Sequence, residues 1–356
     1  MPSHPASLLR GGMGNRQHQK NRSPSTGSFF VMYTFRMART IVGVLRGGAS
    51  SEYDLSLKTG GAMLNALPED SYDVRDIFID KEGYWHSRGM PVDPLRALAQ
   101  VDVVLNGLHG GAGEDGRVQR ILEQAGIPYT GSAAHPSSLS LNKINAGLVL
   151  KKAGIRMPRA VSFTSSSDMD TGKMARLVFS QFGAPYIVKP ASEGGSHGVR
   201  LVATIIELPD ALGDLLDTFG SALVEEYVIG EEATVGIIEG FRDEDLYALP
   251  PARVVYPEES PFLHFDHHRG EELRHMVPSD FTDIEKRALM DAARAAHRAL
   301  GLSQFSRADF IVTKRGPYLL EVNSLPGLHD KAAFPHMLES VGSSVGDFLK
   351  HVLHNV

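Results

Sequence analysis

The chain has 356 residues, of which 42% are hydrophobic, enough to fill two or three domains of ordinary size. It carries 36 Lys and Arg against 42 Asp and Glu, so it lacks the basic field used to bind nucleic acid or a membrane surface, and we expect neither partner. The sequence contains no cysteine, which excludes disulfides and thiolate chemistry, and no apolar run long enough to cross a membrane, so we expect a cytoplasmic protein.

Residues 1–37 differ in composition from the rest of the chain. Up to about residue 28 they are mostly Ser, Gly, Pro, Asn, Gln and basic residues without periodicity. Such a segment buries too little apolar surface to offset the entropy of ordering, and it predicts a disordered extension. A start codon placed too early is the alternative, because Met37 directly precedes the first convincing strand. A secretory signal is disfavoured, since its candidate core at 29–35 is short.

From residue 40 onward, strand-like runs alternate with helical stretches, which is typical of α/β layers. Strands are predicted at 40–45, 101–108, 185–190, 222–228, 233–238, 307–312 and 317–322. Helices are predicted at 52–66, 116–125, 142–153, 205–219 and 282–300. Thr282 and Glu285 have the spacing of a capping box, which supports a helix start at 282. We expect domain boundaries within 126–140 and near 228–231.

A glycine-rich junction, GGASSEYDLSLKTGG at 47–61, joins the first strand to the first helix and has Glu52 in the first helical turn. Free backbone N–H groups at the positive end of a helix dipole suit the anionic part of a ligand. A plain strand-to-helix turn, with an acid favoured by the dipole, is the alternative.

The loop HGGAGEDG at 109–116 directly follows another predicted strand. Its glycines satisfy the G-x-G-x-x-G spacing of dinucleotide-binding folds, but the acid that such folds use for the ribose is missing, since none occurs between Glu123 and Asp168. A dinucleotide fold is therefore disfavoured. Because the loop contains His109 and two acids among its glycines, it is too polar for simple packing, and we predict a site loop.

Two lysines accompany a second glycine-rich loop. Lys143 opens a predicted helix, and Lys189 ends a predicted strand that leads into VKPASEGGSHG at 188–198. The P-loop pattern G-x-x-x-x-G-K-[ST] does not occur. A glycine-rich loop with two lysines can still hold phosphates by backbone donation and point charge. For each lysine alone, a strand-end or helix-end residue beside a solvent loop is the alternative.

The segment SRADFIVTKRGPYLLEVNSLPG at 306–327 carries the strongest signal. It predicts a hairpin in which Glu321 and Asn323 share one face and Asp309 lies opposite them. Two carboxylates and an amide are oxygen ligands suited to Mg²⁺. The alternative, in which Arg307 neutralises the acids, is the minority view, because paired acids in apolar strands are costly without a cation.

The stretch LHFDHH at 263–268 contains ligand types for zinc, including His264 and His267. It has no helix-spaced pair of the H-E-x-x-H kind, so a zinc site is disfavoured and we expect a mobile, partly charged loop.

Together these motifs resemble the D-alanine:D-alanine ligases of the ATP-grasp superfamily over residues 40–353. The resemblance rests on the order and spacing of GGASSEYDLSL (47–57), HGGAGEDGRVQ (109–119), LNK (141–143), IVKPASEGGSHGV (187–199), VEEYVIGEEATV (224–235) and SRADF with LLEVNSLPG (306–327). It implies an α/β ATP-grasp fold of three α/β domains. These are an N-terminal Rossmann-like preATP-grasp domain at 38–140, a central ATP-grasp subdomain at 141–228, and a C-terminal ATP-grasp subdomain with the Mg²⁺ site at 229–356.

The resemblance also implies the reaction. ATP phosphorylates the carboxylate of one D-alanine, and the amine of a second displaces phosphate, giving a dipeptide precursor of peptidoglycan. It implies ATP, two Mg²⁺ ions that Mn²⁺ can replace, and a homodimer. A D-alanine:D-lactate ligase or another ATP-grasp ligase with a changed acceptor is one alternative. A nucleotide-binding relative that has lost turnover is the other.

Roles for ten residues follow from the resemblance. Those that would hold ATP are Lys143 and Lys189 at the phosphates and Glu225 and Glu232 at the adenine and ribose. Those that would bind the metal ions are Asp309, Glu321 and Asn323. Those that would act on the reacting groups are Glu52 near the first substrate's ammonium, and Arg307 with the Gly327 backbone N–H at the oxyanion.

The departures from the family pattern concentrate on the acceptor side. Gly195 stands where the family has a Ser, Ala332 stands where a Ser would hold the acceptor carboxylate, and His267 and the next residue replace a Lys-Tyr pair. We take His109, His264, His267 and Lys331 as candidate substrate residues. A histidine in this loop resembles ligases that accept D-lactate, and Lys331 is a candidate replacement for the missing Ser.

Overall fold

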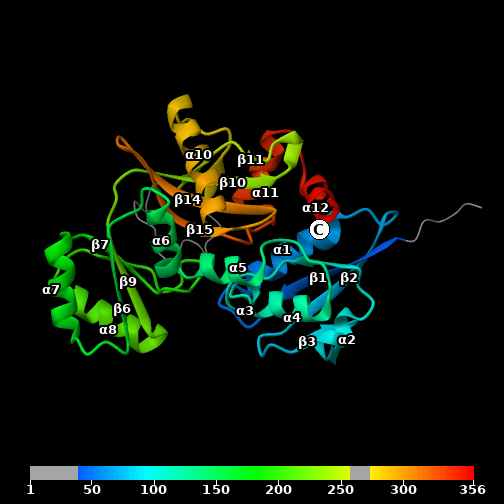
Figure 1. Cartoon of the computed structure of the whole chain (residues 1–356), viewed down its shortest axis with the longest axis horizontal. Coiled ribbons are helices and arrows are strands. Elements are labelled where there is room, and N and C mark those ends of the chain that lie inside the picture. The colour runs from blue at the N-terminus through cyan, green and yellow to red at the C-terminus, as the bar shows by residue number, and fades with distance from the viewer. Residues whose placement is uncertain (1–38, 257–272) are drawn as a thin grey trace, which may run out of the picture. The chain divides into compact units, whose positions relative to one another are not determined.

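Three β-sheets organise the part of the chain that the structure describes, residues 39–256 and 273–356 of a computed structural model (Figure 1). Each sheet is built from one continuous stretch of sequence, 40–106, 160–226 or 231–323. Contacts nevertheless join Arg39–Val356 into one compact unit. The division into domains at 140 and 228 therefore stays a prediction.

The first sheet has the strand order β4-β3-β2-β1-β5. Strand β1 (Thr40–Gly47) pairs in parallel with β2 (Tyr72–Ile79) and with β5 (Val103–Asn106). Its apolar run is buried almost throughout, as expected for a parallel strand that is covered on both faces. The shorter antiparallel strands are β3 (Trp85–Ser87) and β4 (Met90–Val92). The helices of this stretch are α1 (Tyr53–Ala66), α2 (Pro94–Leu98), α3 (Gly111–Glu114) and α4 (Arg117–Ala125).

The second sheet is antiparallel, in the order β6-β9-β7-β8. Its strands are β6 (Ala160–Thr164), β7 (Tyr186–Lys189), β8 (Arg200–Val202) and β9 (Ser221–Glu226). Two helices, α7 (Thr171–Gln181) and α8 (Leu208–Phe219), pack on it and share its core, which includes Tyr186, Leu212 and Val224. Helices α5 (Ala134–Leu141) and α6 (Lys143–Lys152) precede this sheet in the chain (Figure 1).

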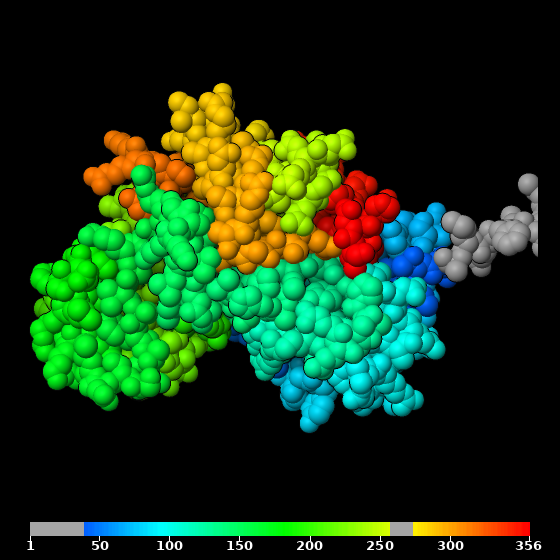
Figure 2. Space-filling model, viewed as in Figure 1, coloured from blue at the N-terminus to red at the C-terminus, as the bar shows by residue number. Residues whose placement is uncertain are grey.

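The third sheet follows the order β13-β12-β10-β14-β15, with β11 paired to β10. Its strands are β10 (Glu231–Glu239), β11 (Leu246–Ala248), β12 (Ala252–Val255), β13 (Arg274–Met276), β14 (Phe305–Thr313) and β15 (Gly316–Asn323). A short 3-10 helix, η1 (Phe241–Asp243), lies between β10 and β11. Helix α10 (Asp283–Leu300) packs on the sheet through Leu289 and Ala293, and its outer face is exposed (Figure 2).

The last two helices, α11 (Ala333–Ser340) and α12 (Val345–His354), connect the first and third sheets. Phe334 and Phe348 share one hydrophobic cluster with Val42 of β1 and Met63 of α1. This shared core explains why the first and last parts of the chain belong to one compact unit, and it fixes the loop before α11 against α1.

The strands and helices predicted from the sequence are present, with ends shifted by up to three residues. The capping box is confirmed, because the Thr282 side chain accepts from the Glu285 N–H and the Glu285 side chain accepts from the Thr282 N–H. Several elements were not predicted, including β2, β6, α7, α11 and α12. No described helix is both long enough and apolar enough to cross a membrane.

Candidate active site

The hairpin β14–β15 brings the predicted metal ligands together. Asp309 pairs directly with Glu321 across the two strands, and Arg307 pairs with Asn323. Alternation of side chains along a strand therefore sets all four on one face of the hairpin. The register changes at a bulge directly after Asp309, so the polar face ends there and the apolar part of the hairpin begins.

Asp309 is held by three side chains. Arg307 donates from Nε to Oδ1 at 3.0 Å and from Nη2 to Oδ2 at 2.8 Å. Thr234 of β10 donates to Oδ1 at 2.6 Å, and Asn323 Nδ2 donates to Oδ2 at 3.0 Å. Burial would lower the pKa of Arg307, but the charge and hydrogen bonds of Asp309 outweigh it and raise that pKa. Arg307 therefore neutralises the charge of the Asp309 carboxylate, as the alternative interpretation of this hairpin expects.

Glu321 is paired with Lys143 instead. The Nζ atom of Lys143 lies 3.3 Å from Glu321 Oε2, and it also donates to the Glu193 carbonyl at 2.6 Å. Burial would raise the pKa of Glu321, but the positive charges of Lys143, Lys189 and Arg307 outweigh it and lower the pKa to about 2. Glu321 is therefore ionised throughout the neutral range.

Lys189 and Glu225 form a buried ion pair. They lie on the neighbouring strands β7 and β9, with Lys189 Nζ 2.7 Å from Glu225 Oε2, and their side chains are only 7% and 6% exposed. The interpretation of Lys189 as a lysine beside a solvent loop is wrong, because its side chain is enclosed. The family resemblance assigns Lys189 to the phosphates of ATP and Glu225 to its adenine and ribose, and in the structure these two side chains contact each other directly.

Glu232 on β10 is hydrogen bonded to the hydroxyl of Tyr256, which directly follows β12. Burial, together with the charges of Asp309 and Glu321, raises the pKa of Glu232 to about 7. Burial and the Glu232 charge also raise the pKa of Tyr256, which therefore stays protonated and able to donate. Tyr256 was not predictable from the sequence, because nothing local distinguishes it from any other aromatic residue at the end of a strand.

Glu52, the N-cap residue of α1, faces this cluster from the first sheet. Its Oε2 atom is shielded from solvent and has no hydrogen-bond partner among the described residues. Burial raises the pKa of Glu52 to about 8, and the nearby charges of Glu114 and Glu321 add to the shift. An unpaired, enclosed carboxylate of this kind favours a cationic group of a ligand.

The loop 109–116 lies at the site, as its polarity predicts. The buried His109 ring contacts Thr59 Oγ1 at 2.8 Å, and burial lowers its pKa to about 3, so the ring is neutral. Glu114 accepts from the Gly110 N–H at 2.7 Å and from Ser324 at 3.3 Å. Burial raises the pKa of Glu114. Glu114 therefore ties this loop to the segment that follows β15.

The segment after β15 contains Gly327, His329, Lys331 and Ala332. Gly327 and Ala332 are buried, His329 is half-buried and Lys331 is exposed. Burial and the charges of Lys58 and Lys331 lower the pKa of His329. The segment is anchored to α1 by the Leu328 N–H, which donates to Thr59 Oγ1 at 3.4 Å. The segment therefore places the charges of Lys58 and Lys331 close to the His329 ring.

Two further histidines were missed by sequence reasoning. The rings of His275 on β13 and His336 on α11 are 6.3 Å apart, and burial followed by the charge of Arg307 lowers the pKa of His275 to about 4. His264 and His267 lie outside the described residues. Within 39–256 and 273–356 no group of three or more His, Cys, Asp or Glu side chains is arranged to hold a metal ion.

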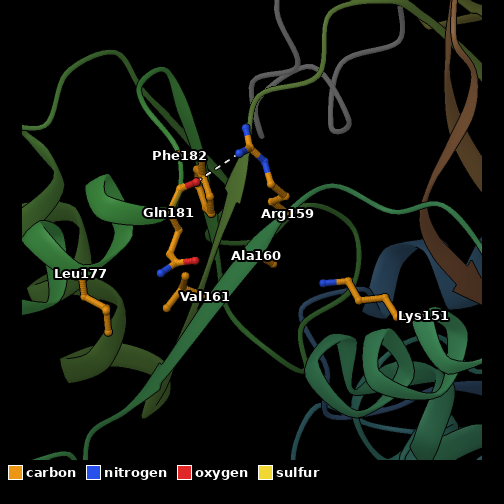
Figure 3. A pocket seen from close by; sticks show the side chains of 7 residues that line it. All are labelled: Lys151, Arg159, Ala160, Val161, Leu177, Gln181 and Phe182. Atoms are coloured by element: carbon orange, nitrogen blue, oxygen red, sulfur yellow. Dashed lines mark hydrogen bonds between the residues drawn. The ribbon is translucent and has the colours of Figure 1, made fainter.

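Two cavities differ in their relation to this site. A small one, of about 20 Å³, is lined by Glu114, Lys143, Gly194, Glu321 and Asn323. A larger one, of about 360 Å³, lies between β6, α7 and the end of α6 (Figure 3). There Arg159 donates to the Gln181 carbonyl and lies over the Phe182 ring. The larger cavity contains none of the predicted site residues.

Comparisons with known proteins agree with one family over nearly the whole described chain. A family model described as D-ala D-ala ligase C-terminus matches residues 149–354, and one described as D-ala D-ala ligase N-terminus matches residues 86–132. A D-alanine–D-alanine ligase of Geobacter sulfurreducens is 36% identical over 323 residues, which cover 88% of this chain and 93% of the relative. One from Anaeromyxobacter sp. strain K is 35% identical over 315 residues, covering 88% and 95%.

Solved structures lead to the same fold. D-alanyl-alanine synthetase A from Vibrio cholerae is 27% identical, with a TM-score of 0.77 and coverage of 90% of this chain and 98% of that one. The D-alanine–D-alanine ligase from Bacillus anthracis complexed with ATP is 27% identical, with a TM-score of 0.72 and coverage of 88% and 96%. VanG D-Ala:D-Ser ligase from Enterococcus faecalis, at 24% identity and a TM-score of 0.77, supports the fold alone.

Proposed function

The chain belongs to the D-alanine–D-alanine ligase family, with the ATP-grasp fold, and on this premise we propose that it joins two molecules of D-alanine at the expense of ATP. The product would be the dipeptide that peptidoglycan synthesis uses. The observation that carries the proposal is the concentration of three cationic and several anionic side chains in one enclosed site, with Lys143, Lys189 and Arg307 as the cations.

For ATP, we propose that Lys143 and Lys189 hold the phosphates and that Glu225 and Glu232 hold the adenine and ribose. Both lysines are buried or nearly so, and in a low-dielectric site their charge acts strongly on phosphate oxygens. Each is 3.3 Å or less from a carboxylate, so the site holds both cations in place before any nucleotide contact forms. Such preorganisation lowers the cost of ordering on binding.

For the metal ions, Asp309, Glu321 and Asn323 fit Mg²⁺ or Mn²⁺, because all three present oxygen atoms on one face of one hairpin. Two bound Mg²⁺ ions would offset the charge of the phosphoryl groups. The hydrogen bonds from Thr234 and Asn323 orient Asp309, in the manner that partners of a metal ligand commonly do.

For the reacting groups, we propose that Glu52 holds the first substrate's ammonium. The carboxylate of that substrate attacks the terminal phosphate of ATP, and ADP leaves. The amine of the second substrate then attacks the carbonyl of the acyl phosphate, phosphate leaves with the bonding pair, and the new amide nitrogen loses a proton to solvent. Arg307 and the Gly327 N–H would stabilise the oxygen that becomes negative, a contribution commonly worth 10²–10³ in rate for one donor. The neutral His109 ring, fixed by Thr59, is a candidate for orienting the first substrate.

The second substrate, the acceptor, is D-alanine in the proposed reaction, with D-lactate or another acceptor as the alternative. Ala332 has no hydroxyl for an acceptor carboxylate, whereas Lys331 is adjacent and His329 lies beside Gly327. We propose that Lys331 takes over the carboxylate. If His264 or His267 also contacts the acceptor, its protonation at low pH would disfavour a cationic amine relative to D-lactate. A ratio of D-alanine to D-lactate rates that does not change from pH 6 to 9 would reject that histidine role.

One assay tests the function and both alternatives. Phosphate release from ATP is measured with D-alanine alone, and then with D-alanine and a panel of acceptors that includes D-lactate. Release with D-alanine alone supports the proposed function. Release only with another acceptor supports a ligase with changed specificity, and ATP binding without release supports a relative that has lost turnover.

We extend the proposal to a cytoplasmic homodimer of three-domain subunits, as the family resemblance implies. The absence of cysteine is consistent with a reducing compartment. Sedimentation of the purified protein distinguishes the dimer from the monomer, and limited proteolysis within 126–140 and near 228–231 tests the domain boundaries.

A further inference from the structure

The larger of the two cavities, of about 360 Å³, combines an apolar lining with two cations. The apolar lining comes from Ala160 and Val161 of β6 and from Leu177 and Phe182 on the side of α7. Figure 3 shows Leu177 and Lys151 on opposite sides of the two β6 residues. Leu177 is 40% exposed, so this apolar surface is open to solvent. A volume near the lower end of the range for small-molecule sites suits a body of one or two rings.

Arg159 is fixed at this cavity by its neighbours. Its Nε atom donates to Glu226 Oε2 at 2.7 Å, and its Nη2 atom lies 2.7 Å from the same oxygen. Its Nη1 atom donates to the Gln181 carbonyl at 3.1 Å, and the guanidinium lies over the Phe182 ring. These contacts use one N–H group of each terminal nitrogen, and each of these nitrogens has a second one. The guanidinium is therefore oriented before a ligand binds and still has donors to offer.

Lys151, in the last turn of α6, is the second cation of the cavity, and its side chain is exposed. Burial would raise the pKa of Glu226, but the hydrogen bonds and charge of Arg159, together with the charge of Lys151, lower it. Lys151 therefore lies close enough to act on the acid that holds Arg159. Because Glu226 balances only one of these two positive charges, the cavity favours an anion.

Strand β6 adds a backbone donor, because it is an edge strand of the second sheet. The Glu226 N–H donates to the Arg159 carbonyl at 2.9 Å. The Ser165 N–H donates in the same way to the Gly220 carbonyl, so the odd-numbered residues of this segment bond toward β9. In an antiparallel pair, the residues between them point their N–H and C=O groups the other way. Ala160 therefore presents an N–H group on the open edge of the sheet, beside the cavity that it lines.

We propose that this cavity binds a small aromatic carboxylate. The carboxylate accepts from Lys151, from the Ala160 N–H and from the remaining N–H groups of Arg159. The rings pack against Val161 and Leu177. Charged donors and backbone N–H groups are the partners that hold carboxylates most strongly, and a monoanion matches the single unbalanced positive charge. The site goes beyond the proposed function, because the cavity contains none of the residues assigned to ATP, the metal ions or D-alanine.

The test titrates the full chain with 2-naphthoate by isothermal calorimetry. We expect a Kd of about 1 mM or below, which the usual binding energy per atom gives a ligand of this size. The uncharged 2-naphthamide and the ringless acetate should each bind at least tenfold more weakly. Saturating ATP and Mg²⁺ should leave the Kd for 2-naphthoate unchanged, because the cavity and the candidate ATP site share no residue. In methyl-labelled protein, the resonances of Val161 and Leu177 should shift on binding.

Matched variants separate the cavity from the surface around it. Lys151→Met should raise the Kd for 2-naphthoate at least fivefold. Lys152→Met, which removes an exposed lysine outside the lining, should change it less than twofold. Leu177→Asp should raise the Kd at least tenfold, because it interrupts the apolar lining and repels the carboxylate. Phe179→Asp is its control and should have little effect, since Phe179 is 57% exposed on the same helix but lies outside the lining.

Opposite results would overturn the inference. It is wrong if 2-naphthoate does not bind at millimolar concentration, or if 2-naphthamide binds equally well. It is also wrong if ATP displaces 2-naphthoate, because the ligand would then occupy the candidate active site. Equal effects of Lys151→Met and Lys152→Met would reject the site in favour of a general attraction to surface charge. These titrations involve no turnover, so a failure of the proposed function would leave their outcome unaffected.

Discussion

The buried pair of Lys189 and Glu225 allows the structural and functional parts of the site to be separated. Lys189→Met keeps most of the side-chain volume but leaves Glu225 enclosed without its partner at 2.7 Å. Removing one member of a buried ion pair costs about 3–5 kcal/mol, so we expect the free energy of unfolding, measured by chemical denaturation, to fall by that amount. Adding Glu225→Leu removes the unpaired charge, and the double variant should return to within about 1–2 kcal/mol of the wild type.

ATP affinity should respond differently. Both Lys189→Met and the double variant lose a charged donor to phosphate, which is worth about 1.5–3 kcal/mol, so the Kd for ATP should rise at least about tenfold in each. The exposed pair of Arg200 and Asp214, 2.6 Å apart in the same part of the chain, is the control, and Arg200→Met should cost less than about 1 kcal/mol. The reasoning is refuted if Lys189→Met costs no more than this control, or if the double variant keeps wild-type ATP affinity.

Three further predictions concern the rest of the site. Because burial raises the pKa of Glu52 to about 8, its carboxyl group is mostly protonated at pH 6. The KM of the first D-alanine should therefore fall as the pH rises toward 8 and level off above it. Glu52→Gln should remove this dependence on pH. Steady-state kinetics that show a KM independent of pH in the wild type contradict the assignment. Lys331→Ala should raise the acceptor KM about tenfold without changing that of the first substrate, and an unchanged acceptor KM rejects the role of Lys331. Asp309→Ala leaves the half-buried Arg307 without its partner and removes a proposed metal ligand, so kcat should fall at least about a hundredfold. A fall of less than tenfold at saturating Mg²⁺ would argue against both roles.

The hairpin β14–β15 was predictable from the sequence because its signal is local. Strand alternation places Glu321 and Asn323 on one face, and the observed register puts Asp309 opposite Glu321 on that face. The helix start at Thr282 was predictable for the same reason, since a capping box requires two residues three positions apart. Strand β2 was not predictable, because Asp73, Arg75 and Asp76 interrupt its apolar pattern.

The contacts that define the site depend on tertiary structure, and local patterns do not encode them. Lys189 and Glu225 are separated by an intervening helix and strand, and their pairing depends on the register of β7 against β9. The enclosure of Glu52 by glycines depends on two loops from different sheets. His275 carried no motif, and only the folded structure brings β13 close enough for the charge of Arg307 on β14 to act on its ring. The resemblance to the family assigned roles to Lys189, Glu225 and Glu52, while their contacts with one another and with the loops required coordinates.

The most direct test of the central claim is the identity of the product. The purified chain is incubated with ATP, Mg²⁺ and D-alanine, and the products are analysed by mass spectrometry together with the amounts of ADP and phosphate. We predict the dipeptide D-alanyl-D-alanine, with one ADP and one phosphate for each molecule formed. ATP that binds without forming dipeptide or phosphate, while the protein remains folded, would contradict the account.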